Sequence, residues 1–162
     1  EDGIRDFCLS RGLGDVYKRQ VYSVLRQKLD GVIIKAHEAG IGIVARTALE
    51  SGFLTGKYPP DYTFPADDHR ARWSREHLNF VLETTQDIGK MVVSPYTSIS
   101  QMATKFSLSN PGVSTLILGA RNSDQVIENM NTSKLPMLSS PTLEMLKHRY
   151  GNITEKCNTK II

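Results

Sequence analysis

Two short runs at residues 41–45 (IGIVA) and 113–118 (VSTLIL) constrain the fold more than any other feature of this sequence. The first is almost wholly apolar and the second is β-branched and apolar, a pattern typical of strands buried on both faces of a parallel sheet. Helical patterns precede and follow each run. Because a connection that contains a helix joins parallel strands, the sequence predicts an α/β fold with a parallel sheet.

Apolar residues at helical spacing predict helices before, between and after these strands. Ser74 stands at the start of one predicted helix, and Ser98 with Gln101 has the capping-box pattern at the start of another. Residues 50–72 are rich in Gly, Pro, Asp and Tyr, and a loop of this length often covers a ligand. The predicted helices span residues 24–38, 74–93, 98–108, 123 to about 130, and 141–150.

The first twenty residues differ from the rest of the chain, because they show neither helical nor strand periodicity. The stretch CLSRGLGDVYKRQ resembles a translated sequencing-adapter tail joined to a truncated reading frame, and such additions are excluded from fold reasoning. We therefore expect residues 1–20 to be foreign or disordered, residues 21–150 to form the α/β domain, and residues 151–162 to be a frayed tail.

The charge balance and the cysteines exclude several classes of protein. Twenty Lys and Arg against 17 Asp and Glu give a net charge of +3 without a long run of like charges, which argues against nucleic-acid binding. No apolar run approaches the roughly 18 residues of a membrane span. Cys8 and Cys157 lie near opposite ends with no partner spacing, so we expect neither a disulfide framework nor a thiolate metal site, and a cytoplasmic location.

Ligands of α/β proteins gather at the carboxyl ends of the strands, which directs attention to residues 46–51 and 119–122. Residues 119–122 (GARN) lead into a predicted helix, whose free N–H groups attract an anion, and Arg121 would add a planar cation suited to phosphate. The plain alternative is that Asn122 or Ser123 only caps the helix and that Arg121 is solvated.

Residues 116–129 (LILGARNSDQVIEN) resemble the last strand and helix of aldo-keto reductases. The resemblance implies that this segment surrounds the adenosine 2′-phosphate and adenine of NADPH. The residues it assigns there are Gly119, Arg121, Gln125, Glu128 and Asn129. Gln125, Glu128 and Asn129 are three and four residues apart, which puts them on one helix face.

Residues 42–58 (GIVARTALESGFLTGKY) are similar to the seventh strand of the same family and the loop that follows it. The resemblance implies further cofactor-binding residues at Arg46, Thr47, Ala48, Leu49, Ser51 and Lys57. Arg46 stands where the commoner family form has an aromatic residue that stacks on the nicotinamide, and Thr47 and Ala48 replace Ser and Pro. An Arg guanidinium can also lie flat on a ring, so Arg46 keeps the role possible. Lys57 is equally well explained as an ordinary loop lysine.

The resemblance implies the C-terminal portion of a (β/α)8 barrel that reduces small aldehydes or ketones with NADPH. The family's catalytic Asp, Tyr, Lys and His belong to early strands upstream of this chain, so no catalytic residue is assigned here and Tyr22 is not a candidate. We expect the open barrel to expose Ile41, Ile43, Val113 and Ile117, and the isolated chain to be unstable and inactive. A non-catalytic subunit of the kind that accompanies ion channels, or a nucleotide-phosphate-binding module, remains open.

Two further groups invite a chemical interpretation. Residues 67–70 (DDHR) could ligate a metal or transfer a proton, but adjacent residues rarely converge on one ion, so loop charges facing water are favoured. His37, His77 and His148 lie at helix positions without a second ligand at useful spacing, which favours surface or helix-terminal roles. We therefore expect no metal site.

Overall fold

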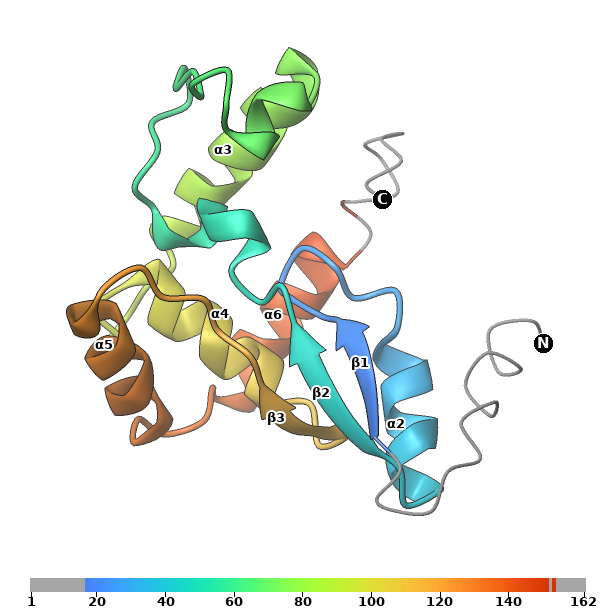
Figure 1. Ribbon diagram of the computed structural model, residues 1–162. Helices are drawn as coiled ribbons and strands as arrows, with labels where there is room; N and C mark the ends of the chain where they lie inside the picture. The colour runs from blue at the N-terminus through green and yellow to red at the C-terminus, as the bar shows by residue number, and fades with distance from the viewer. Residues whose placement is uncertain (1–16, 152, 154–162) are drawn as a thin grey trace.

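The computed structural model describes residues 17–151 and residue 153, and it folds them into a small parallel sheet with helices (Figure 1). The elements follow one another as β1 (Tyr17–Val21), α2 (Asp30–Glu38), β2 (Gly42–Arg46), η1 (Glu50–Thr55), η2 (His69–Arg72), α3 (Arg75–Gly89), α4 (Ile99–Leu108), β3 (Val113–Leu116), α5 (Ser123–Ser133) and α6 (Ser140–Tyr150). The prediction of an α/β fold is confirmed.

The sheet has the order β1-β2-β3, and both strand pairs are parallel. The register pairs Val21 with Arg46 and Ala45 with Leu116, so the three strands end at the same edge. An irregularity follows Ile43, whose backbone N–H donates to Ser114 Oγ at 3.1 Å. Such a bulge re-aims the strand that leads to residues 117–121.

Strand β1 occupies residues that the sequence assigned to a foreign or disordered segment. Residues 17–20 are ordered and pair with β2 along their whole length, while the foreign origin of the segment stays a prediction. The expectations for residues 1–16 and for residues 152 and 154–162 of the tail lie outside the described residues.

One face of the sheet is buried and the other is open. Ile43 and Ala45 are fully buried, because α2 packs against β2 and α4 packs against β3. Val44, on the opposite face, is half-buried and Arg46 is exposed. The prediction of strands buried on both faces is therefore wrong, since the described helices cover a single face.

Because of this one-sided packing, most of the four apolar side chains that were expected to be exposed are covered. Ile43 and Val113 are buried and Ile41 is half-buried, whereas Ile117 is 47% exposed beyond the end of β3. Only Ile117 thus shows the wide exposure that was expected for all four.

The predicted helix starts are confirmed where a side chain caps them. Ser74 Oγ accepts a hydrogen bond from the backbone N–H of His77. Ser98 Oγ accepts one from the N–H of Gln101, and Asn122 Oδ1 accepts one from the N–H of Gln125. Each bond satisfies a backbone donor that the first helical turn leaves free.

The predicted helix at residues 24–38 begins only at Asp30. Ser23 and Arg26 exchange backbone hydrogen bonds of 3.1 and 3.3 Å, which form a turn instead of a first helical turn. Val24 and Leu25 are buried within this turn, so the burial of Leu25 does not depend on a helix at this position. Helix α3 ends at Gly89 rather than at residue 93.

Asp30 joins three parts of the chain at the start of α2. It accepts hydrogen bonds from Tyr22 Oη at 2.6 Å, from Asn110 Nδ2 at 2.7 Å and from Lys147 Nζ at 3.0 Å. Burial alone would raise the pKa of Asp30, but the bonds from Tyr22 and Lys147 outweigh it and lower that pKa. The network fastens α6 and the turn before β3 to α2.

Candidate functional site

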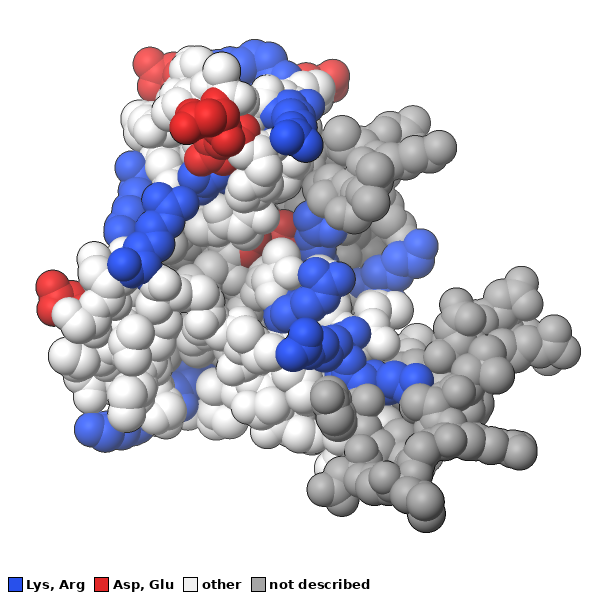
Figure 2. Space-filling model, in the orientation of Figure 1, with Lys and Arg blue, Asp and Glu red and all other residues white. Residues whose placement is uncertain are grey.

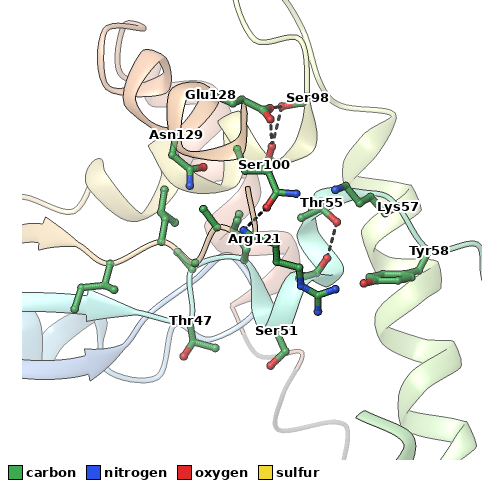
Figure 3. Close-up of a pocket in the computed structure, with 18 of the residues that line it drawn as sticks. Thr47, Ser51, Thr55, Lys57, Tyr58, Ser98, Ser100, Arg121, Glu128 and Asn129 are labelled. Carbon is green, nitrogen blue, oxygen red and sulfur yellow. Dashed lines mark hydrogen bonds between the residues drawn. The ribbon is translucent and has the colours of Figure 1, made fainter. Parts of the chain in front are cut away.

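A cavity of about 640 Å³ lies where β2 and β3 end (Figure 3). Its walls come from the turn after β2, the segment after β3, one face of α5, the start of α4 and the side chains of Tyr58 and Arg70 in the long loop. The lining residues are Thr47, Ala48, Leu49, Ser51, Gly52, Thr55, Lys57, Tyr58, Arg70, Ser98, Ser100, Ile117, Leu118, Gly119, Ala120, Arg121, Gln125, Glu128 and Asn129. This is the edge at which parallel sheets bind ligands.

The cavity brings together ten of the eleven residues predicted to bind a cofactor. These are Thr47, Ala48, Leu49, Ser51, Lys57, Gly119, Arg121, Gln125, Glu128 and Asn129. Arg46 is not among them, because it is the last residue of β2 and is exposed outside the cavity. The placement shows a shared cavity, and the binding role of each residue stays a prediction.

Sequence reasoning missed the remaining lining residues for identifiable reasons. Ser98 was interpreted only as a helix cap, and Ser100 is the second residue of the same helix. Five others lie within two residues of a predicted residue, so treating each strand end as one continuous segment would have found Gly52, Thr55, Ile117, Leu118 and Ala120. Tyr58 and Arg70 come from the long loop, whose path no local pattern predicts.

The turn after β2 is strained. Thr47, Glu50 and Ser51 have positive φ angles of 64°, 46° and 53°, and Gly52 follows at 89°. Side chains other than glycine rarely adopt this conformation, and such strain is concentrated at ligand sites.

A buried ion pair holds this turn in place. Glu50 Oε1 and Oε2 accept from Arg26 Nε at 2.8 and 2.9 Å, and Oε1 also accepts from Ser23 Oγ at 2.9 Å. Burial raises the pKa of Glu50, while Arg26 and Ser23 oppose that rise. The turn between β1 and α2 thereby supports the strained turn that lines the cavity.

The opposite wall is built on hydrogen bonds of α5. Gln125 Oε1 accepts the backbone N–H of Arg121 at 2.8 Å, which shapes the segment between β3 and α5. Ser98 and Ser100 both donate to Glu128 Oε1 at 3.4 Å and so connect the start of α4 to α5 (Figure 3). The side chain of Asn129 lies beside this group.

The cavity carries both cations and an acid. Lys57 and Arg121 are exposed at its rim, on opposite walls, and Glu128 is exposed on α5. Figure 2 shows Lys and Arg side chains beside the hollow on the face in view. Two cations together with free N–H groups at the start of α5 suit a ligand with more than one phosphate.

The family model for the Aldo/keto reductase family matches residues 16–148. The chain belongs to the aldo/keto reductase family. The membership predicted from the two strand ends is confirmed, and the match begins within the segment that was expected to be foreign.

Several aldo/keto reductase relatives are longer than this chain. A probable voltage-gated potassium channel subunit beta of Arabidopsis thaliana is 27% identical over 143 residues, covering 83% of this chain and 44% of the relative. L-glyceraldehyde 3-phosphate reductase of Escherichia coli (strain K12) is 26% identical over 117 residues, which cover 67% of this chain and 34% of that relative. The chain thus spans less than half the length of the curated relatives it matches.

Solved aldo/keto reductase structures share the fold. A glycerol dehydrogenase from Gluconobacter oxydans superposes with a TM-score of 0.70 at 21% identity, over 83% of this chain and 42% of that one. At this identity the likeness shows the fold alone.

The segment at residues 67–70 differs from its prediction. Asp67 and His69 are exposed as expected, but Arg70 is buried and paired with Asp68. Within residues 17–151 and 153, no group of three acidic, His or Cys side chains is placed to hold a metal. None of the described helices is long and apolar enough to cross a membrane.

His37 and His148 are exposed, and His77 lies in the first turn of α3, so all three occupy the surface or helix-terminal positions that were expected; His77 is nevertheless buried. It is 4% exposed, with its ring 5.1 Å from that of Trp73. Burial, and then the charge of Arg26, lower the pKa of His77 below its ordinary value.

This lowered pKa predicts a pH dependence of stability. Below the ordinary pKa of about 6.5 the unfolded chain binds a proton that the folded chain does not, so stability falls with decreasing pH. We expect His77→Asn to flatten the loss of unfolding free energy between about pH 7.5 and pH 5.5. Urea unfolding at several pH values measures the unfolding free energy, and His148→Asn, at an exposed histidine, is the control. The same change of unfolding free energy with pH in both variants would refute the prediction.

Proposed function

We propose that this chain is the NADPH-binding, C-terminal portion of a (β/α)8-barrel oxidoreductase that reduces aldehydes or ketones to alcohols. NADPH would supply the hydride. The residues described here would bind and orient it, and the catalytic Asp, Tyr, Lys and His would come from strand ends upstream. The chain by itself is then inactive, and reduction of an aldehyde by the purified chain with NADPH would contradict this part.

The observation that carries the proposal is the cavity between the two strand ends. Its volume of about 640 Å³ lies in the range of ligand pockets, roughly 300–1,000 Å³. One wall holds the strained turn with Ser51 and Lys57, and the other holds Arg121 before the start of α5. An elongated ligand with phosphates along its length fits cations on both walls.

The chemistry of the lining residues fits a dinucleotide with a 2′-phosphate. Arg121 and the N–H groups at the start of α5 would hold the 2′-phosphate, and Lys57 would lie along the pyrophosphate. Gln125, Glu128 and Asn129 offer amide and carboxylate oxygens to the adenine amine. Arg46, at the end of β2 and outside the cavity, would lie towards the nicotinamide.

Exposed apolar residues support the incomplete barrel. Ile117 is 47% exposed after β3, and Ile127 and Met130 of α5 are 55% and 65% exposed. Additional strands and helices of a longer protein would cover such surfaces. A complete barrel has about 250 residues.

A non-catalytic regulatory subunit is the second candidate. The relative in Arabidopsis thaliana is named a probable potassium channel subunit beta, and such a subunit could use the same dinucleotide site. Reduction of aldehydes by the longer parent protein separates the two functions, because a purely regulatory subunit would bind NADPH without turnover.

The preference for a 2′-phosphate is tested by replacing Arg121. We expect Arg121→Met to weaken NADPH binding about tenfold and to change NADH binding less than about twofold, because only NADPH carries that phosphate. Calorimetric titration measures both affinities. Lys134→Met, at the other end of α5, is the matched loss of one charge. An equal loss of affinity for NADPH and NADH in Arg121→Met would show that Arg121 does not bind the 2′-phosphate.

A further inference from the structure

The long loop between η1 and α3 forms an arm, residues 58–73, that packs through aromatic rings onto η1. Phe53 of η1 stacks on Trp73 at 5.3 Å between ring centroids and meets Phe64 edge-on at 5.6 Å. Tyr58 and Tyr62 close the group, with ring centroids 4.8 Å apart. The arm is therefore a packed unit joined to a wall of the cavity.

Arg70 lies at the centre of this aromatic group with its side chain only 3% exposed. Its guanidinium carbon is 4.2 Å from the centroid of the Phe64 ring and 4.9 Å from that of Tyr58. A buried cation needs hydrogen-bond partners for its N–H groups, and the bonds of Arg70 identify what it holds.

Four of the five N–H donors of a guanidinium are occupied. Nε and Nη2 donate to the two Asp68 oxygens at 2.9 and 2.6 Å. Nη1 donates to the backbone oxygen of Ser51 at 2.9 Å and to Tyr58 Oη at 3.0 Å. Arg70 thus ties the arm to the strained turn, where a Cβ on Gly52 would lie 3.5 Å from Nη1.

A buried arginine at a phosphate site would ordinarily be taken as a phosphate ligand. We infer instead that Arg70 and Asp68 form a latch that positions Ser51 and Gly52 for dinucleotide binding, leaving the contacts to phosphate to Lys57 and Arg121. Arg70 is then a positioning residue. The inference rests on the proposed function and goes beyond it.

Replacing Asp68 separates the two roles by the sign of the effect. Asp68 does not line the cavity, and Asp68→Asn removes a negative charge close to it. A phosphate-binding Arg70 freed of its counter-ion would hold NADPH as tightly or more tightly. A latch would loosen, and we expect NADPH affinity to fall about tenfold, as for the loss of a charge-assisted hydrogen bond.

Two further variants complete the comparison of NADPH affinities. Asp67→Asn removes the same charge from the neighbouring, exposed residue and is expected to change NADPH affinity less than about twofold. Arg70→Lys keeps the charge but loses the planar fork, so a latch predicts a loss similar to that of Asp68→Asn. Unchanged or tighter NADPH binding by Asp68→Asn would overturn the inference.

Backbone hydrogen exchange measured without ligand tests the latch independently of whether the chain binds NADPH. We expect faster exchange in residues 51–52 and 58–73 of Asp68→Asn than of Asp67→Asn, with α2 unchanged. If the wild-type chain binds no NADPH, the proposed function fails, and this comparison still decides the latch, since equal exchange overturns it. Tyr58→Phe, which removes one bond to Arg70, replaces Asp68→Asn if that variant does not fold.

Discussion

Replacing Arg26 by methionine is expected to lower the free energy of unfolding by about 3 kcal/mol or more. Glu50 is 4% exposed and its carboxylate faces Arg26 Nε at 2.8 Å. Without Arg26 the carboxylate stays buried, and Ser23 is the one side-chain donor left to it among the residues that the structure describes. Removing one partner of a buried pair costs more than the pair contributes, because the remaining charge has lost its compensation.

Urea unfolding followed by the emission of Trp73, the single tryptophan of the chain, measures this loss. Arg72→Met is the control, because Arg72 is exposed. Adding Glu50→Gln to Arg26→Met removes the uncompensated charge and should recover part of the stability. A loss below about 1 kcal/mol for Arg26→Met would show that the pair does not hold the turn.

Replacing Phe53 by alanine is expected to cost about 3–5 kcal/mol of unfolding free energy. Its ring is fully buried and contacts Tyr58, Phe64 and Trp73, so the smaller side chain leaves a cavity between η1 and the arm. Trp73 should become more exposed and its emission should shift to longer wavelength.

Unfolding in urea, followed by far-ultraviolet circular dichroism, measures the effect of Phe53→Ala independently of Trp73. Ile127→Ala removes an apolar side chain that is 55% exposed and should cost much less. Similar losses for the two variants would mean that the aromatic group contributes little to stability.

The sequence was sufficient for the α/β class and for the position of the cavity. The apolar run at residues 41–45 overlaps β2 and the run at 113–118 contains β3, and residues after each strand line one cavity. Capping residues such as Ser98 and Asn122 act through neighbouring backbone N–H groups, so local patterns predict them well.

Features that depend on distant contacts could not be predicted in this way. The sequence of β1, YKRQV, has no apolar run, and its strand conformation follows from pairing with β2. The turn at Arg26 depends on Glu50, which lies 24 residues away. Arg70 has the pattern of a surface charge, and only the folded arm surrounds it with aromatic rings.

Calorimetric titration of the purified chain with NADPH, NADH and ATP tests directly whether the two strand ends form a site for NADPH. We expect one NADPH to bind per chain, more tightly than NADH or ATP. Binding of ATP as tight as that of NADPH, or the absence of NADPH binding by folded chain, would contradict it.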